Sequence, residues 1–263
     1  MTGKVKVAIT GASGLVGSHL AQHLIERGHD VVAMSRTAPT EPSLKQIQGP
    51  GSLWLKKVDV LNEKELLEAF GGFDVVVHAA GTVDPYGSRE SIFNTNVEGT
   101  KTAMRAAKAA GVKQFIFVSS LSVITGQGDQ YDVDETAELK PCGESYADSK
   151  VEAERAVMSE PVNSSMQVTS VRPGFIYGPR EKAWMPRLIN SIGTGKAMLI
   201  GGGTRQTNVI YVGNLSYAIE KALLNPKAYG QVFNLTDGET ISKKQLFDAI
   251  SDGLGLPRVK KQI

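Results

Sequence analysis

A tyrosine and a lysine stand four positions apart in the segment YADSK at 146–150. In a helix this spacing puts Tyr146 and Lys150 on one face. Because a nearby ammonium stabilises a phenolate, we expect Lys150 to lower the pKa of Tyr146 toward working pH. Such a phenol can protonate a carbonyl oxygen or take a proton from an alcohol. The alternative is a surface Tyr–Lys pair without chemistry, since one pair at this spacing also arises by chance.

Two serines end an upstream apolar run, FIFV at 115–118, and offer hydroxyls for the same chemistry. Ligands of a doubly wound parallel sheet bind at the carboxyl ends of its strands. A hydroxyl there can hydrogen-bond a substrate carbonyl and orient it beside the phenol. We therefore select Ser120 as the third catalytic residue, with Ser119 as the next candidate. The alternative is that these serines only end a strand or cap a turn.

A glycine-rich segment near the start of the chain predicts a site for a dinucleotide pyrophosphate. The sequence TGASGLVG at 10–17 follows the apolar run VKVAI and leads into a helical pattern. Gly11 permits the tight turn, Gly14 lets backbone N–H groups approach phosphates, and Gly17 lets helix pack on strand. The helix N-terminus adds a favourable partial positive charge. We expect Ser13, Leu15 and Val16 to join these glycines at the cofactor. The alternative is an ordinary strand-to-helix turn.

The elements that must position these residues alternate along the chain. Apolar runs predict strands at 5–10, 30–34, 53–58, 75–78, 114–118 and 168–172, and periodic patterns predict helices at 14–27, 63–70, 95–110 and 145–159. Continuous apolar strands separated by helices indicate a parallel sheet covered on both faces. The predicted fold class is therefore α/β, a doubly wound parallel sheet (Rossmann fold) with a smaller C-terminal substrate domain. The segment 37–51, with three prolines and two glycines, predicts an irregular connection.

The pattern changes after Arg172, where turn signals surround short elements and helices are expected at 214–224 and from 242 toward 253. We therefore assign residues 1–172, completed by part of 207–235, to a dinucleotide-binding domain. Residues 173–263 are assigned mainly to substrate binding. The chain ends in a basic, polar stretch soon after Pro257, so we expect either a truncated chain or a tail without fixed structure.

Composition indicates a globular protein of one or two domains: 263 residues, 41% hydrophobic and 21% charged. The net charge of +2 gives no reason to expect nucleic acid or an acidic membrane as a partner. The single cysteine, Cys142, excludes an internal disulfide and fits a reducing compartment. No apolar stretch is long enough to span a membrane, and the first strand begins too early for a signal peptide. We expect a cytoplasmic location.

Together these motifs resemble the extended short-chain dehydrogenase/reductase family. The residues that carry the resemblance are TGASGLVG at 10–17, DV at 59–60, HAAG at 78–81, NVEGT at 96–100, VSS at 118–120, YADSK at 146–150 and RPGFIYGP at 172–179. They follow the family's order from about residue 5 to 180. The resemblance implies hydride transfer to or from a nicotinamide through a Ser–Tyr–Lys set, here Ser120, Tyr146 and Lys150.

The resemblance also implies cofactor contacts. Asp59 and Val60 would lie at the adenine ring, and Pro173 and Ile176 near the nicotinamide. Lys150 would also hydrogen-bond the nicotinamide ribose. The remaining cofactor residues implied are His78, Ala79, Ala80 and Gly81 at the end of the fourth strand, Asn96, Ser119 and Tyr146.

The end of the second strand bears on which dinucleotide binds. An NAD site usually places an acid there for the ribose 2′-hydroxyl. Here the strand DVVAM is followed by Ser35 and Arg36, and Asp30 sits at its beginning. Arg36 offers a planar fork for a 2′-phosphate and Ser35 a small hydroxyl. The sequence therefore favours NADP(H), with NAD(H) as the alternative; a solvated arginine would carry no preference.

The substrate class is indicated by a departure from a family pattern. Nucleotide-sugar epimerases and dehydratases often carry GDG…R…VDD, whereas this chain has GGG at 201–203, Thr207 and VGN at 212–214. Arg205 would restore the phosphate contact only if the alignment slips by two residues. YVGN at 211–214 and DPYG at 84–87 are more similar to the branch of 3β-hydroxysteroid dehydrogenases, dihydroflavonol reductases and related ketone reductases. Candidate substrate residues are Ser120, Tyr86, Ser88, Phe175, Tyr177, Trp184 and Met185; ordinary packing is the alternative for each.

The four histidines show no metal-ligand pattern, and we expect no metal. His19 and His23 lie at i, i+4 without a third ligand, so solvent-facing positions are expected. The expected partner is a small carbonyl or alcohol compound. Because family members often dimerise through the helices that correspond to 95–110 and 145–159, a homodimer is a further expectation.

Two other functions stay open. The nearest is a nucleotide-sugar epimerase or dehydratase with retained NAD, which would consume no added NADPH. The other is a non-catalytic binding protein that senses the NADP redox state. Retention of both Tyr146 and Lys150 favours an enzyme over this binding protein. The same retention favours an enzyme over a purely structural module.

Overall fold

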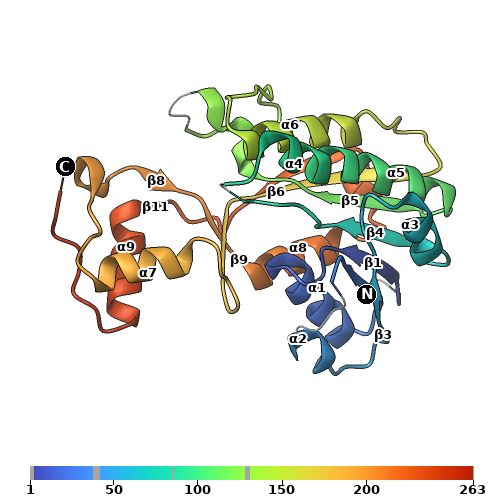
Figure 1. Ribbon diagram of the computed structural model, residues 1–263, viewed down its shortest axis with the longest axis horizontal. Helices are drawn as coiled ribbons and strands as arrows, with labels where there is room; N and C mark the ends of the chain where they lie inside the picture. Colours follow the sequence, from blue (N-terminus) through green and yellow to red (C-terminus); the bar gives the residue numbers. More distant parts are fainter. Residues whose placement is uncertain (1–2, 38–41, 85, 128–130, 263) are drawn as a thin grey trace. The chain divides into compact units, whose positions relative to one another are not determined.

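The computed structural model describes residues 3–37, 42–84, 86–127 and 131–262. They form two compact units, each shown in Figure 1. The larger comprises Met1–Pro173 with Gly213–Leu235, and the smaller comprises Gly174–Val212 with Thr236–Ile263.

The larger unit is built on a seven-stranded sheet in the order β10-β6-β5-β4-β1-β2-β3, in which all neighbours are parallel. Its strands are β1 (Lys6–Thr10), β2 (Asp30–Ser35), β3 (Leu53–Lys57), β4 (Val75–His78), β5 (Gln114–Val118), β6 (Gln167–Pro173) and β10 (Gln231–Leu235). The strand order reverses between β1 and β4, which is where a doubly wound sheet binds ligands. The predicted fold class is confirmed.

Helices cover both faces of this sheet (Figure 1). They are α1 (Leu15–Glu26), α2 (Pro42–Lys45), α3 (Glu63–Phe70), α4 (Arg89–Phe93), α5 (Gly99–Ala109), α6 (Ser145–Met158) and α8 (Val212–Ala222), with short 3₁₀ turns at Leu121–Gln127 and Pro226–Ala228. Within the described part of the chain, no helix combines the length and apolarity needed to cross a bilayer.

The core explains why the strand sequences are so uniformly apolar. Because β2, β4 and β5 are buried along their whole length, both of their faces need apolar side chains. On the face covered by α3, α5 and α6, Leu66 and Phe70 pack with Phe115 and Phe117. Each large side chain buried in this way stabilises the fold by about 1.5–3 kcal/mol. This packing fixes α6, which carries Tyr146 and Lys150, and α5, which follows the turn that holds Asn96.

Two connections differ from the sequence prediction. The helix expected at 95–110 begins earlier, because the Ser88 hydroxyl caps α4 by accepting a hydrogen bond from Ser91 N–H. A π-helical turn, Asn94–Glu98, then joins α4 to α5. The connection predicted as irregular at 37–51 contains the short helix α2; its residues 38–41 lie outside the described part of the chain.

The smaller unit contains two short sheets and two helices. Strand β7 (Phe175–Tyr177) pairs in parallel with β9 (Val209–Tyr211), and β8 (Gln206–Thr207) pairs antiparallel with β11 (Ile241–Ser242). The helices are α7 (Met185–Gly193) and α9 (Lys243–Gly253), with a 3₁₀ turn at Ile200–Gly203. A capping box between Ser242 and Gln245 starts α9.

Candidate active site

A cavity of about 230 Å³ lies at the carboxyl end of the sheet in the larger unit. Its lining residues are Thr10, Gly11, Ser13, Gly14, Met34, Ser35, Arg36, Thr37, Val58, Val60, Leu66, Ala79, Ala80, Gly81 and Thr95. It thus joins the glycine loop, the end of β2 and the end of β4. We call it the nucleotide groove.

The glycine loop is shaped for close backbone approach. Gly11 has φ +69°, and a Cβ there would lie 2.7 Å from the Cα of Ala80. A Cβ at Gly17 would lie 2.5 Å from the carbonyl oxygen of Gly11. Gly14 is the N-cap of α1 and brings no side-chain cap to its first N–H groups. Uncapped N–H groups at a helix start suit an anion, so this cradle fits a dinucleotide pyrophosphate.

The far end of the groove carries Ser35 and Arg36. Arg36 is exposed and lines the groove, whereas Ser35 is buried and its hydroxyl donates a 2.6 Å hydrogen bond to Thr37 O. Asp59 is exposed and turned to its own loop, where its carboxylate accepts a hydrogen bond from Leu61 N–H. Of the predicted adenine pair, Val60 lines the groove and Asp59 is not among the lining residues.

His78, at the end of β4, is the centre of a buried hydrogen-bond network. Thr100 donates its hydroxyl to Asn96 O at 2.6 Å, so its oxygen accepts from His78 Nε2, 3.1 Å away. Nδ1 of His78 is then the acceptor for the Thr10 hydroxyl at 2.9 Å. Burial and the charge of Lys150 lower the pKa of His78 to about 3, so the ring is neutral. Thr10 Oγ1 in turn accepts from Ala80 N–H, which fixes the HAAG turn.

Asn96 lies in the π-helical turn and ties three segments together. Its carbonyl oxygen accepts from Thr82 N–H at 2.8 Å, and its amide donates to Thr82 O and to the Ser149 hydroxyl on α6. A Cβ at Gly81 would lie 3.2 Å from that oxygen and 3.5 Å from Lys150 Nζ. The extra backbone room of a π-turn is common at functional sites. Asn96 therefore holds the segment after Gly81 against α6.

The structure brings Ser120 and Tyr146 together. Burial raises the pKa of Tyr146 and Glu144 adds to the rise, whereas the nearby Ser120 hydroxyl lowers it. The net pKa of Tyr146 is above its ordinary value. The prediction that Lys150 lowers it is wrong for this arrangement, because burial disfavours the phenolate. The neighbouring Ser119 is 3% exposed, and its Oγ has no hydrogen-bond partner among the described residues.

Lys150 is buried beneath the end of β5. Its Nζ donates to Val118 O at 2.8 Å and lies 4.7 Å from the centre of the Phe117 ring. Burial lowers the pKa of Lys150 to about 8, and the charge of Glu154 opposes that fall. The ammonium form therefore still dominates at neutral pH. Lys150 thus supplies a buried cation close to Gly81. It is hydrogen-bonded to Val118, the residue directly before Ser119 and Ser120.

The start of α6 is held by two acids. Glu144 caps the helix by accepting from the N–H groups of Tyr146 and Ala147. Asp148 accepts from the N–H groups of Cys142 and Gly143 and pairs with Arg89 at 2.9 Å. These contacts hold the pKa of Asp148 below its usual value although burial opposes them. They fix the turn that precedes Tyr146.

The predicted substrate residues lie in both units, and each unit is described by itself. In the larger unit, Tyr86 is 89% exposed, and Pro85 lies outside the described residues. In the smaller unit, Phe175 and Tyr177 share one face of β7. Phe175 contacts Trp184 edge-on at 5.9 Å between ring centres, and Tyr177 contacts Tyr211 at 5.7 Å.

Two further predicted residues, one in each unit, have defined backbone contacts. The carbonyl of Ile176 accepts from Trp184 Nε1 at 2.9 Å. Pro173 ends β6 opposite Leu235. The Tyr177 hydroxyl donates to Asp237 at 2.9 Å, and burial together with that carboxylate raises its pKa to about 12.

The histidines of α1 need one correction. His23 is not solvent-facing: its Nε2 lies 2.8 Å from Glu220 of α8, and the carboxylate also binds Arg27. Amphipathic spacing alone does not reveal α8, which arrives about two hundred positions later. His19 is half-buried. Among the described residues, no group of three or more His, Cys, Asp or Glu side chains is placed to hold a metal ion.

The structure adds groove residues that were not among the predicted cofactor contacts: Thr10, Met34, Thr37, Val58, Leu66 and Thr95. Thr10 and Val58 stand at or just after the carboxyl ends of β1 and β3. These two residues could have been predicted from their positions in the sequence, because the carboxyl ends of parallel strands meet at one edge of the sheet. Several predicted cofactor residues are not among the lining residues: Leu15, Val16, Gly17, His78, Asn96, Ser119, Tyr146 and Lys150.

Comparison with known proteins agrees with this geometry. Residues 7–236 match the NAD dependent epimerase/dehydratase family. A 2-alkyl-3-oxoalkanoate reductase of Stenotrophomonas maltophilia is 29% identical over 98% of this chain and 78% of its own length. A 3-beta-hydroxysteroid dehydrogenase of Mycolicibacterium neoaurum is 30% identical over 90% of this chain and 67% of its own length.

A solved structure of an NAD-binding enzyme has the same fold. The Bordetella bronchiseptica enzyme WbmG, in complex with NAD and UDP, matches with a TM-score of 0.80 and 25% identity, covering 99% of this chain and 81% of that one. The resemblance to extended short-chain dehydrogenases/reductases is therefore confirmed. The chain is an NAD(P)-dependent enzyme and belongs to the NAD dependent epimerase/dehydratase family.

Proposed function

We propose that the protein is an NADP(H)-dependent oxidoreductase that moves hydride between the nicotinamide and an apolar ketone or aldehyde, or the corresponding secondary alcohol. The observation that carries this proposal is the buried Lys150 ammonium, which donates to Val118 O at the end of β5, directly before Ser119 and Ser120. The Ser120 hydroxyl also lies near enough to Tyr146 to lower the pKa of its phenol. The names of two curated relatives, a reductase of 2-alkyl-3-oxoalkanoates and a 3-beta-hydroxysteroid dehydrogenase, support carbonyl–alcohol chemistry.

The roles of the three residues follow from their chemistry. Bound NADPH supplies the hydride. Ser120 hydrogen-bonds the substrate carbonyl and orients it, and Tyr146 donates its phenolic proton to the carbonyl oxygen. A raised pKa keeps Tyr146 protonated at neutral pH, which favours its use as an acid in reduction. Lys150 supplies a buried positive charge at the end of β5 and, as the family resemblance implies, would hydrogen-bond the nicotinamide ribose.

NADP(H) is proposed over NAD(H) because of the residues at the end of β2. Arg36 is exposed at the groove and can bind a 2′-phosphate through two N–H groups. The last residues of β2 and the two that follow carry no carboxylate that would repel the phosphate. Ser35 contributes less, since its hydroxyl already donates to Thr37 O.

The smaller unit is proposed to bind substrate. The aromatic face made by Phe175, Tyr177, Trp184 and Tyr211 would suit an apolar compound. Phe175 is 59% exposed, so its ring is available for contact.

A second candidate function is that of a nucleotide-sugar epimerase or dehydratase with retained NAD, favoured by the match to a structure that holds NAD and UDP. Against it, Thr207 stands where such enzymes carry a phosphate-binding arginine, and it is buried in β8. This reading predicts a dinucleotide that survives purification and no consumption of added NADPH.

The test is isotope transfer from NADPH deuterated at C4. The substrates would be a 2-alkyl-3-oxoalkanoate and the ketone of a 3β-hydroxysteroid, chosen from the names of the relatives. We expect deuterium on the carbinol carbon of the product and stoichiometric release of NADP⁺. Product without deuterium, or turnover without net NADPH oxidation, would refute the proposed reaction.

A further inference from the structure

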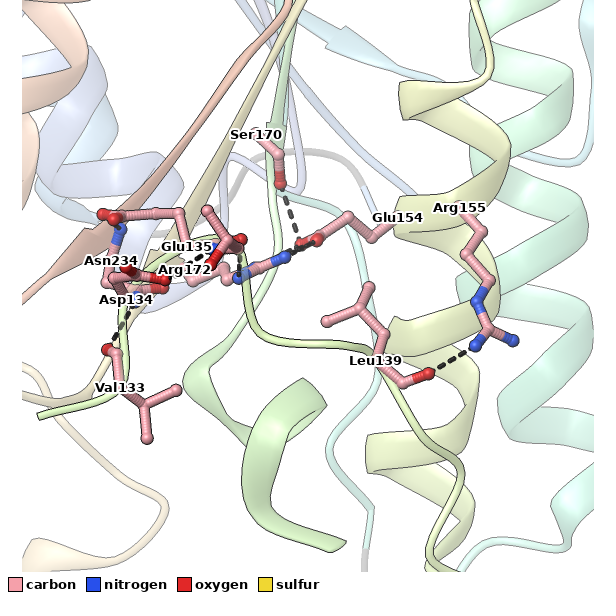
Figure 2. Close-up of polar contacts among 10 residues, drawn as sticks. Val133, Asp134, Glu135, Leu139, Glu154, Arg155, Ser170, Arg172 and Asn234 are labelled. Atoms are coloured by element: carbon pink, nitrogen blue, oxygen red, sulfur yellow. Dashed lines mark hydrogen bonds and ion pairs between the residues drawn. The ribbon is translucent and has the colours of Figure 1, made fainter. Parts of the chain in front are cut away.

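Behind the proposed active site, α6 and β6 are joined by a buried ion pair, Glu154–Arg172 (Figure 2). The side chains are 1% and 3% exposed. Arg172 Nε donates to both carboxylate oxygens at 2.9 and 3.2 Å, and its Nη2 donates to Oε1 at 2.6 Å. The contact is thus bidentate, the geometry that holds a guanidinium and a carboxylate in one relative orientation.

The pair is extended by a contact within β6 and by contacts to two further segments. The Ser170 hydroxyl, on β6, donates to Glu154 Oε2 at 3.0 Å. Arg172 Nη1 donates to Glu135 O, in the loop that leads to α6. The Glu135 carboxylate accepts from Asn234 N–H of β10 at 2.7 Å, as Figure 2 shows. One network therefore holds the loop before α6, the middle of α6 and the carboxyl ends of β6 and β10.

Such a pair is a costly way to fasten a helix. Removing two charges from water carries a penalty that their mutual attraction only partly offsets, and apolar side chains of similar size often stabilise a fold as well. The apolar contacts of Ala153 and Val157 already pack α6 on the core. The ion pair is therefore better explained by the orientation and charge it provides than by the stability it adds.

Its place in the chain points to the active site. Glu154 follows Lys150 by four positions on α6, and therefore lies on the same helix face one turn further on. Arg172 precedes Pro173, the last residue of β6, at the carboxyl edge of the sheet. We propose that Glu154 and Arg172 are positioning residues: their ion pair sets the orientation of α6 that keeps Tyr146 at Ser120 and the Lys150 ammonium at Val118 O. This inference rests on the proposed function of those three residues.

The same pair also sets the charge that Lys150 feels. Burial lowers the pKa of Lys150 and Glu154 raises it. The other titratable groups near Lys150 are His78 of β4, which is neutral, and Tyr146, which is protonated. Arg172 is held against Glu154. If Glu154 loses its charge, Lys150 loses its only anion in this set and faces an unpaired Arg172, so its pKa must fall.

The first experiment measures the pKa of Lys150 by NMR of lysine side chains, with Lys150→Met to assign the signal. Glu154→Gln keeps the size of the side chain; its amide oxygen can accept from Arg172 and its amide nitrogen can donate to Ser170. We expect the pKa of Lys150 to fall by about 1 in this variant. The matched control is Glu152→Gln, which removes the same charge from a 52% exposed side chain of α6 and leaves the pKa unchanged. Equal pKa values in wild type and Glu154→Gln would overturn the charge role.

The second experiment measures kcat/KM against pH with NADPH. The reaction needs the Lys150 ammonium, so kcat/KM should fall at alkaline pH. We expect this fall to occur about 1 pH unit lower in Glu154→Gln than in wild type or Glu152→Gln. A lower rate with an unmoved limb would mean a merely structural role. If wild type shows no NADPH-dependent turnover, the proposed function fails, while the NMR result still decides whether Glu154 sets the pKa of Lys150.

Glu154→Asp covers the case in which Glu154→Gln does not fold, as judged by circular dichroism. Aspartate keeps the charge but is one methylene shorter, so it cannot hold both nitrogens of Arg172. We expect the pKa of Lys150 to stay near that of wild type and kcat to fall about tenfold. Wild-type kcat in Glu154→Asp would show that the bidentate contact positions nothing.

Discussion

The Nζ atom of Lys150 donates a 2.8 Å hydrogen bond to the carbonyl oxygen of Val118. This bond joins α6 to the last residue of β5, directly before Ser119 and Ser120. The phenol of Tyr146, one turn earlier on α6, reaches the Ser120 hydroxyl. The helix and the strand end therefore meet at two polar contacts, and the buried lysine is one of them. These contacts, with the nucleotide groove beside them, are the basis of the predictions below.

Removing the phenolic hydroxyl tests the proton donor. Tyr146→Phe should lower kcat by about 10²- to 10⁴-fold, because it removes the proposed proton donor to the carbonyl oxygen. Affinity for NADPH should change by less than about threefold, since the groove is untouched. Steady-state kinetics and nicotinamide fluorescence measure the two effects. Tyr217→Phe, at a 53% exposed tyrosine of α8, is the matched control. Near-normal turnover of Tyr146→Phe would contradict the assigned role.

The charge at the end of β2 should decide the cofactor. We expect Arg36→Ala to weaken NADPH binding about 10- to 100-fold and to leave NADH binding within about twofold. Arg105→Ala, which removes an equal charge from the exposed surface of α5, should change neither affinity. Titration of each variant with both nucleotides checks this. Equal losses for NADPH and NADH would exclude a contact with the 2′-phosphate.

The glycine turn should tolerate no side chain at Gly11. A Cβ there meets the backbone of Ala80 at 2.7 Å and the residue has φ +69°, so Gly11→Ala should lower the free energy of unfolding by more than about 2 kcal/mol. Gly72 separates the two causes, because it has φ +80° but nothing within 4 Å of its Cβ position. Gly72→Ala should cost only about 1 kcal/mol. Urea unfolding of both variants measures the difference; similar costs would show that the close approach to Ala80 is unimportant.

Stability should fall in mild acid because of His78. Its folded pKa of about 3 lies below the ordinary 6.5, so the unfolded chain binds the extra proton between these values. The stabilisation is complete above pH 6.5 and is lost as the pH falls, by about 1.4 kcal/mol per pH unit between 6 and 4. His78→Gln should be less stable at pH 7 and should lose less on acidification. Urea unfolding at pH 7 and 5 measures this, and parallel pH dependences of the two proteins would count against a neutral buried His78.

Most of the larger unit could be predicted from sequence for one physical reason. Parallel strands buried on both faces need mainly apolar side chains, so β2, β4 and β5 are recognisable as apolar runs in the sequence. The predicted helix at 145–159 agrees with α6 to within one residue. Gly17 could be predicted equally well, because its close contacts are with Gly11 and Ala12 of the same strand–turn–helix unit. The close approach of Gly11 to Ala80, by contrast, joins segments that are distant in the sequence.

What the sequence left out depends on contacts between distant segments. Burial raises the pKa of Tyr146, and a local Tyr–Lys spacing does not report burial. The pairing of His23 with Glu220 joins α1 to a helix near the other end of the chain. The π-helical turn at Asn94–Glu98 carries Asn96, whose hydrogen bonds to Thr82 and Ser149 join segments that no periodicity connects. The homodimer through 95–110 and 145–159 stays a prediction.

The account rests on an exchangeable NADP(H) that serves as a hydride carrier. The most direct measurement is titration of the purified protein with NADPH and NADH by nicotinamide fluorescence, after assay for any dinucleotide released on denaturation. We predict little dinucleotide carried through purification and binding of NADPH at least about tenfold tighter than NADH. A bound dinucleotide that does not exchange, or a preference for NADH, would contradict the account and favour an epimerase or dehydratase with retained NAD.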